Sequence, residues 1–141
     1  MKAVVVYDTQ FGNTEQVARG IAKVINADTI KVSEVEVSKL KPYDLFAFGC
    51  PVHAWNMSSG MKKALQKLEG ESFAGKKAGT FDTRIASRMA GNAATKIQKK
   101  LKKLGFEIIM KPVHFIVAGR EGPLAEGEMD KVQAFTALKS T

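Results

Sequence analysis

The chain has 141 residues, of which 45% are hydrophobic and 26% charged, and it carries a formal net charge of +8. This composition is typical of one ordinary globular domain over residues 1–141, and it excludes a membrane span and a signal peptide. One cysteine and two histidines exclude a disulfide framework and a metal-ligand cluster, and a lone thiol fits a cytoplasmic protein. The positive charge favours anionic partners, namely a phosphorylated ligand, an acidic protein or nucleic acid.

The first element predicted along the chain is a strand that runs into a phosphate-binding loop. An apolar run over 3–7 indicates a buried strand, and the spacing of apolar residues predicts a helix over 14–26, with Asn13 and Gln16 as a capping pair. The loop between them, over 9–14, combines two threonine hydroxyls, an asparagine amide and a glycine backbone. Because the first N–H groups of a helix have no partner within it, this loop is a pocket for a phosphate.

The remaining strands are predicted from short apolar runs. A strand over 28–32 has the partial alternation of a sheet edge, and the polar connector over 33–43 has room for a short helix. Strands over 44–49 and 77–81 lack polar alternation, as expected of strands buried on both faces of a parallel sheet. A last strand over 106–118 is interrupted by a Lys-Pro pair, because proline cannot donate to a ladder.

Helices are predicted between these strands. One begins after the candidate caps Ser58 and Ser59, and another spans 92–104 and ends at Gly105, a residue suited to a left-handed cap. The second of these helices is rich in lysine, which indicates a solvated face. Binding of nucleic acid is disfavoured, since no aromatic residues interleave with the lysines. A final helix is marked by apolar residues at 129, 132, 135 and 138.

Strands and helices alternate along the chain, which is typical of an α/β protein with a parallel sheet covered on both faces. Ligands of such sheets bind at the carboxyl ends of the strands, near the switch in strand order. Three loops are therefore expected to converge on one site, namely those over 9–14, 49–57 and 82–91.

The chemistry of these loops excludes several classes of phosphate-binding protein. A P-loop protein needs a lysine after its glycines, and a dinucleotide fold needs three spaced glycines, whereas the first loop has neither. A receiver domain needs an aspartate at the end of the third strand, where Phe48-Gly49-Cys50 stands. A low-molecular-weight tyrosine phosphatase needs an arginine a few residues after its cysteine, whereas the first arginine after Cys50 is Arg84. A phosphate held by hydroxyls and backbone remains.

The segment over 5–21, with Thr-Gln-x-Gly-Asn-Thr at 9–14, resembles the signature of the flavodoxin family along its full length. Gly49-Cys50-Pro51 followed by Trp55-Asn56 resembles the flavodoxin loop that stacks an aromatic ring on the isoalloxazine. The resemblance covers the whole chain in its short form and implies a flavodoxin-like three-layer sandwich with a five-stranded parallel sheet of order 2-1-3-4-5. It also implies FMN as the cofactor, electron transfer as the activity and a redox protein as the partner.

The resemblance assigns parts of the flavin to particular loops. The phosphate is expected on the loop over 9–14 and the ring between the other two loops, with Trp55 stacked on it. Residues 82–84 are candidate hydrogen-bond partners of its pyrimidine edge and carbonyls, and His53 is a candidate proton donor. No catalytic residue is predicted. The expected cofactor-binding residues are Thr9, Gln10, Phe11, Gly12, Asn13, Thr14, Pro51, Val52, His53, Ala54, Trp55, Asn56, Asp82, Thr83 and Arg84.

Two departures from the family pattern shape the functional hypotheses. Flavodoxins are typically acidic, whereas this chain is basic, which favours an acidic redox partner. The third loop has no aromatic residue, so the second flavin face is either open or covered by Arg84, Ile85 or Met89. The main hypothesis is an FMN-binding electron carrier. The alternatives are an FMN-dependent oxidoreductase for a quinone or porphyrinogen, or a flavin-free interaction module that binds an acidic partner through the helix over 92–104.

Overall fold

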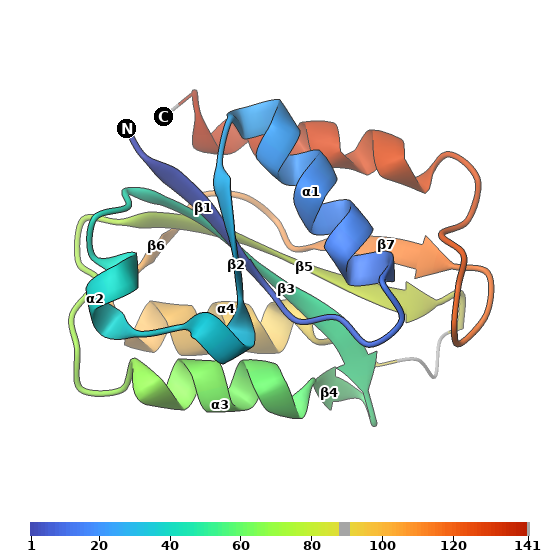
Figure 1. Cartoon of the computed structure of the whole chain (residues 1–141), viewed down its shortest axis with the longest axis horizontal. Coiled ribbons are helices and arrows are strands. Elements are labelled where there is room, and N and C mark those ends of the chain that lie inside the picture. The colour runs from blue at the N-terminus through green and yellow to red at the C-terminus, as the bar shows by residue number, and fades with distance from the viewer. Residues whose placement is uncertain (88–90, 141) are drawn as a thin grey trace.

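A computed structural model describes residues 1–87 and 91–140 of the chain. These residues form a sheet with helices on both of its faces (Figure 1). The sheet is built around β1, which pairs in parallel with β2 on one side and with β3 on the other. The strands are β1 (Ala3–Tyr7), β2 (Asp28–Lys31), β3 (Leu45–His53), β4 (Asn56–Met57), β5 (Lys77–Ile85), β6 (Glu107–Ile108) and β7 (Val113–Val117).

The order of the strands confirms the predicted topology. Parallel pairing continues from β3 to β5, and from β5 to both β6 and β7. β6 and β7 are the two parts of the interrupted last strand, so together they take the fifth place in the order 2-1-3-4-5. β4 was not expected, and it pairs antiparallel with the end of β3.

Two strands extend beyond their predicted ends. β3 continues to His53 and β5 to Ile85, so residues 51–53 and 82–85 lie in strands rather than in loops. The pairing explains this difference, because β5 continues beside β3 to the pair Pro51 and Thr83, and beside β7 to its last residue. Backbone pairing on both sides of β5 therefore outweighs the polar character of its end.

Helices cover both faces of the sheet, with α1 and η2 on one face and α3 and α4 on the other (Figure 1). The side chains of β1 alternate between the two cores, so that Val4 and Val6 face α3 and α4 whereas Val5 and Tyr7 face α1. Two short helices fill the connector that was expected to hold one. The helices are α1 (Asn13–Ile25), η1 (Val32–Glu34), α2 (Val37–Leu40), α3 (Ser59–Lys67), α4 (Ala94–Lys103) and η2 (Glu128–Leu138).

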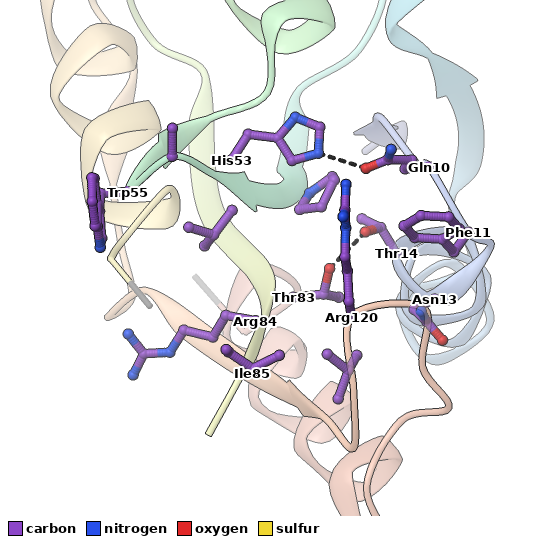
Figure 2. Close-up of a pocket in the computed structure, with 14 residues that line it drawn as sticks. Gln10, Phe11, Asn13, Thr14, His53, Trp55, Thr83, Arg84, Ile85 and Arg120 are labelled. Atoms are coloured by element: carbon purple, nitrogen blue, oxygen red, sulfur yellow. Dashed lines mark hydrogen bonds between the residues drawn. The ribbon is translucent and has the colours of Figure 1, made fainter. Parts of the chain in front are cut away.

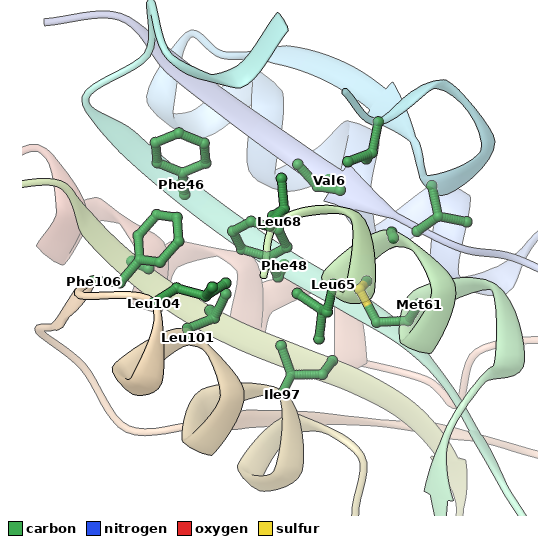
Figure 3. Close-up of a cluster of buried hydrophobic side chains, with 14 of the residues drawn as sticks. Val6, Phe46, Phe48, Met61, Leu65, Leu68, Ile97, Leu101, Leu104 and Phe106 are labelled. Atoms are coloured by element: carbon green, nitrogen blue, oxygen red, sulfur yellow. The ribbon is translucent and has the colours of Figure 1, made fainter. Parts of the chain in front are cut away.

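Aromatic rings fill the core under α3 and α4 (Figure 3). Phe46 and Phe48 of β3 stack with their centroids 5.8 Å apart, and Phe106 meets Phe46 edge-on at 5.0 Å. Leu65 of α3 and Leu101 of α4 cover this core on the side away from the sheet. Because both helices use their apolar faces here, their polar faces remain on the surface of the molecule.

The last helix, η2, is a 3₁₀ helix of 11 residues, which is long for this geometry. The spacing of its apolar residues explains the choice, because side chains three positions apart align in a helix with three residues per turn. Val132, Phe135 and Leu138 are thereby all buried. Met129 packs against Gly20 of α1, where a larger residue would clash with it.

The thiol of Cys50 is expected to be unreactive in the folded protein. The residue is fully buried, and this burial raises the pKa of the thiol to about 12. Since the thiolate is the nucleophile, iodoacetamide at pH about 8.5 should label the folded chain at least about 100-fold more slowly than the chain in urea. Mass spectrometry of the quenched samples measures both rates. Equal rates would contradict the burial of this strand end.

Candidate functional site

A pocket of about 400 Å³ opens at the carboxyl ends of β1, β3 and β5 (Figure 2). This is the edge of the sheet at which the sequence places its ligand, and the volume lies in the usual range for a cofactor site. The pocket brings together most of the residues predicted to bind a cofactor. Its lining consists of Gln10, Phe11, Asn13, Thr14, Pro51, Val52, His53, Ala54, Trp55, Thr83, Arg84, Ile85, Val117 and Arg120.

The phosphate loop is held in shape by its own polar groups. Thr9 Oγ1 accepts a hydrogen bond of 3.0 Å from Gly12 N. Neither residue lines the pocket, but this bond holds the loop in shape. Gly12 has a φ of 90°, a conformation that glycine adopts without strain. The first hydrogen bond inside α1 runs from Gln16 N to Gly12 O. The N–H groups of Asn13, Thr14 and Glu15 therefore have no acceptor in the helix and are available to an anion.

The expected capping pair at the start of α1 is wrong. Gly12 is the N-cap, and no side chain accepts a hydrogen bond there. Asn13 Nδ2 instead donates to Glu121 O at 3.1 Å, which ties the phosphate loop to the loop after β7. A side chain at Gly122 would clash with Asn13, so glycine is needed at this close approach. The cap was predicted from local spacing, whereas the true partner of Asn13 lies far along the chain.

A buried hydrogen bond joins the phosphate loop to β5. Thr14 Oγ1 and Thr83 Oγ1 are 2.8 Å apart, and the two residues are almost completely buried. Both also line the pocket (Figure 2). The bond fixes the start of α1 relative to the middle of the sheet, so the N–H groups of the helix are preorganised rather than mobile.

Trp55 lies at the tip of a tight hairpin. The turn of this hairpin consists of Ala54 and Trp55, which connect β3 to β4. Both have positive φ, 46° and 65°, as a two-residue type I′ turn requires. Lys96 Nζ donates to Trp55 O at 2.7 Å, and Gly91 packs against the backbone of Trp55. The indole is 58% exposed and lies on one side of the pocket, with Phe11 on the other (Figure 2). An exposed ring on a rigid turn is suited to stacking.

His53 connects two walls of the pocket. Its Nε2 lies 2.7 Å from Gln10 Oε1, so a hydrogen bond spans the gap between the end of β3 and the phosphate loop (Figure 2). Of the neighbouring residues, Pro51, Val52 and Ala54 line the pocket, but Asn56 does not. The amide of Asn56 turns back to accept a hydrogen bond from Met57 N, and the residue lines a groove on the other side of the hairpin.

Asp82, which was expected to contact the flavin ring, is not among the residues that line the pocket. The side chain is fully buried and points away from the site. Its Oδ2 accepts hydrogen bonds from Ala93 N and Ala94 N at the start of α4, and its Oδ1 lies 2.8 Å from His114 Nδ1. The carboxylate therefore stabilises the N-terminus of a helix. In the extended strand β5 it faces the start of α4, on the side of the sheet opposite to Thr83, which bonds to Thr14 of α1.

One side of the pocket has no aromatic ring among the described residues, as the third loop of the sequence led us to expect. The residues on this side are Arg84, Ile85 and Arg120. Arg84 Nη1 donates to Gly91 O at 2.9 Å, and Ile85 is 45% exposed. Arg120 extends across the pocket toward the side that carries His53 (Figure 2). Within the described part of the chain it has no hydrogen bond or ion pair. Met89, the other candidate for this face, lies outside the described residues.

Sequence reasoning assigned no role to Val117 or Arg120, although both line the pocket. Val117 ends β7, and Arg120 follows in a turn closed by the hydrogen bond from Gly122 N to Gly119 O. The one signal in the sequence was their position, since the loop after the last strand opens at the same edge of the sheet.

These residues fit FMN. Free helix N–H groups beside two threonines suit a phosphate, and the apolar walls beside Trp55 suit a flat ring. The described residues contain no group of three potential metal ligands. Among the helices described, none combines the length and apolar composition that a membrane crossing needs.

The sheet topology defines a doubly wound α/β protein, and the pocket lies where such sheets bind their ligands. The sequence profile of the flavodoxin family, described as Flavodoxin, matches residues 5–135. The chain therefore belongs to the flavodoxin family, which makes it an electron-transfer protein of the FMN type.

Individual relatives are similar over most of the chain. The uncharacterized protein MJ0298 of Methanocaldococcus jannaschii is 32% identical over 110 residues, which cover 77% of this chain and 71% of that protein. Oxidised Flavodoxin 1 from Bacillus cereus has a similar structure, with a TM-score of 0.86 and 21% identity over 99% of this chain and 98% of its own. A flavodoxin from the domain Archaea reaches a TM-score of 0.79 at 20% identity, covering 99% and 98%.

Proposed function

We propose that this protein binds FMN in the pocket between the phosphate loop and the Trp55 hairpin and carries electrons between redox proteins. The observation that carries the proposal is the placement of two features on one cavity of about 400 Å³. One feature is the start of α1, with N–H groups free for a phosphate, and the other is an exposed indole on a rigid turn. A flavin mononucleotide has the matching phosphate and flat ring.

The residues of the chain have separate tasks in this proposal. The N–H groups after Gly12, with Thr9 holding the loop and Thr14 in its wall, bind the phosphate. Trp55 stacks on the ring and excludes water from one face. Thr83 and Arg84 lie where they can orient the ring, and His53 is placed to hold a proton near it. FMN, when bound, supplies the one-electron and two-electron chemistry.

Two titrations test this function. FMN added to the apoprotein should lose its fluorescence as it binds, and dithionite reduction of the complex, followed by absorbance, should resolve into two one-electron steps. Undiminished flavin fluorescence at saturating protein would overturn the proposal and leave a flavin-free interaction module. Reduction in a single two-electron step would favour an enzyme over a carrier.

A second candidate function is an FMN-dependent oxidoreductase for a quinone or porphyrinogen. The favouring observation is that Ile85, 45% exposed, and Val117 line the pocket on the side without an aromatic ring. Such a surface leaves room for an apolar substrate. Multiple-turnover reduction of a quinone by the FMN-loaded protein, with NAD(P)H as the electron donor, would support this candidate, whereas a single stoichiometric electron exchange supports the carrier.

Arg120 is expected to strengthen the binding of FMN. The hydrogen bonds from Asn13 Nδ2 to Glu121 O and from Ala118 N to Pro123 O hold its loop, so the guanidinium stays over the pocket. Arg120→Gln should weaken FMN binding about tenfold, the loss expected for a hydrogen bond to a charged group, and riboflavin binding far less. Arg19→Gln, which removes an exposed arginine of α1, is the matched control. Equal FMN affinities for the two variants would show that Arg120 does not contact the ligand.

A further inference from the structure

A second groove, of about 380 Å³, lies between α3 and α4 on the face of the sheet away from α1 (Figure 1). Both of its walls are helical stripes with the spacing i, i+3, i+4 and i+7, which places each set on one side of its helix. The wall from α4 consists of lysines only, and the opposite wall is mixed. The lining comprises Asn56, Met57, Lys62, Leu65, Gln66, Glu69, Lys96, Lys99, Lys100 and Lys103.

The charge of this groove is not neutralised by the protein. Five lysines line it against one glutamate, and α4 has no acidic residue anywhere in Ala94–Lys103. Within the part of the chain that the structure describes, the side-chain ammonium groups of Lys99, Lys100 and Lys103 make no hydrogen bond or ion pair. Lysines four positions apart on a helix repel each other, so the stripe costs stability in the free protein. An anionic occupant would remove that cost.

The floor of the groove is apolar, which distinguishes it from a plain basic surface. Met57 and Leu65 are each only 4% exposed and lie between the two charged walls. No aromatic residue lines the groove, so it lacks the stacking platform of a single-stranded nucleic-acid site. A complementary occupant would place carboxylates against the lysines and an aliphatic side chain against the floor. An acidic polypeptide segment carries both kinds of group. The lysine stripe spans about 10 Å, or two helical turns.

The groove adjoins the candidate flavin site. Asn56 and Met57 belong to β4, the return strand of the Trp55 hairpin, and both line the groove. Lys96, at one end of the lysine stripe, donates its hydrogen bond to Trp55 O. A segment seated in the groove therefore lies against the hairpin that forms a wall of the pocket.

The geometry points to the groove between α3 and α4 as the docking site for an acidic segment of a redox partner, which would bring that partner beside the Trp55 edge of the pocket. The identity of the partner as a redox protein rests on the proposed function. The docking itself rests on the lysine stripe, the apolar floor and their place next to the hairpin. Opposite charges at such a surface increase the rate of association and select the partner.

The test uses the apoprotein and a fluorescein-labelled octapeptide of glutamates with two leucines. Anisotropy should show binding that weakens as salt increases, and the emission of Trp55 should change on binding. Lys99→Glu with Lys100→Glu should reduce affinity at least about tenfold. The new carboxylate at position 99 precedes Lys103 by one turn, which favours the helix, so this variant should fold. Lys99→Gln with Lys100→Gln should give a smaller loss in the same direction.

The control is Lys39→Glu with Lys111→Glu, which changes the net charge equally at two exposed positions outside the groove. It should retain affinity within about threefold, since only distant charges change. An equal loss in both double variants would overturn the proposal in favour of net charge alone. Equal binding of a short oligothymidylate of the same charge would overturn it in favour of a general polyanion surface. Because no flavin is present, failure here leaves the FMN titration intact, and failure of that titration leaves the groove intact.

Discussion

Replacing Thr14 by aspartate should abolish the binding of FMN. Thr14 is 1% exposed, lines the pocket and stands in the first turn of α1, where the phosphate is expected. A carboxylate there would face the phosphate from a few ångströms, and two unit charges about 4 Å apart repel by about 4 kcal/mol near a protein surface. The affinity should therefore fall by about 1,000-fold, which fluorescence titration measures directly.

Two further measurements separate this effect from damage to the fold. Thr14→Val removes the hydroxyl bonded to Thr83 without adding charge, and Thr14→Ser keeps a hydroxyl, so both should bind FMN far more tightly than the aspartate variant. Riboflavin, which has no phosphate, should bind the aspartate variant with little loss. An FMN affinity equal to that of the wild type would mean that the phosphate lies elsewhere, whereas parallel loss of riboflavin binding would indicate misfolding.

Removing the carboxylate of Asp82 should be the most destabilising single change in this part of the sheet. The side chain is completely buried and accepts from Ala93 N and Ala94 N while it pairs with His114. In Asp82→Ala, two buried backbone donors and the partly exposed imidazole of His114 lose their partner. The free energy of unfolding should fall by about 3–5 kcal/mol, since each buried donor left unpaired costs about 1–3 kcal/mol. Thermal unfolding followed by circular dichroism should show a Tm lower by about 10 °C or more.

Asp82→Asn is the matched control for this prediction. Its amide oxygen can still accept from the start of α4, and its amide group can donate to His114, so the loss should be about 1–2 kcal/mol. Neither variant should lose FMN binding at a temperature where it is folded, because Asp82 does not line the pocket. A folded Asp82→Ala protein that fails to bind FMN would restore the contact with the flavin that the sequence suggested. An unchanged Tm would show that the buried pair contributes nothing.

The position of Asp82 shows why a local sequence pattern does not predict which side chains line a site. The residue ends an apolar run, so its position predicts a loop and its charge predicts a ligand contact. In the structure β5 continues to Ile85 because β3 and β7 pair with it on both sides. Alternation along this strand then turns Thr83 toward Thr14 of α1 and Asp82 toward the start of α4, where its carboxylate is buried. The length of a strand depends on its neighbours, which composition within one run does not reveal.

The positions of Asn56 and Arg120 also depend on contacts that the local sequence does not show. The hairpin turn at Ala54 and Trp55 reverses the chain, so Asn56 leaves the pocket and lines the groove instead. Arg120 enters the pocket because Asn13 holds the neighbouring carbonyl of Glu121. Each position follows from a contact between two segments, the antiparallel pairing of β3 with β4 or the hydrogen bond from Asn13 to Glu121. A local sequence pattern does not predict such contacts.

What the sequence determined by itself is the local part of the site. The strand over 3–7, the loop over 9–14 and the helix that follows are contiguous, so their composition is enough to predict a phosphate cradle. The alternation of elements is enough to predict a parallel sheet covered on both faces, and the resemblance to the flavodoxin family implied the order of its strands. Only the tertiary structure decided that Asp82 supports α4, that Arg120 reaches the pocket, and that the stripes of α3 and α4 form one groove beside Trp55. The physical reason is that backbone donors at a helix start belong to one short segment, whereas pockets and grooves are made by side chains that pairing and burial bring together from separate ones.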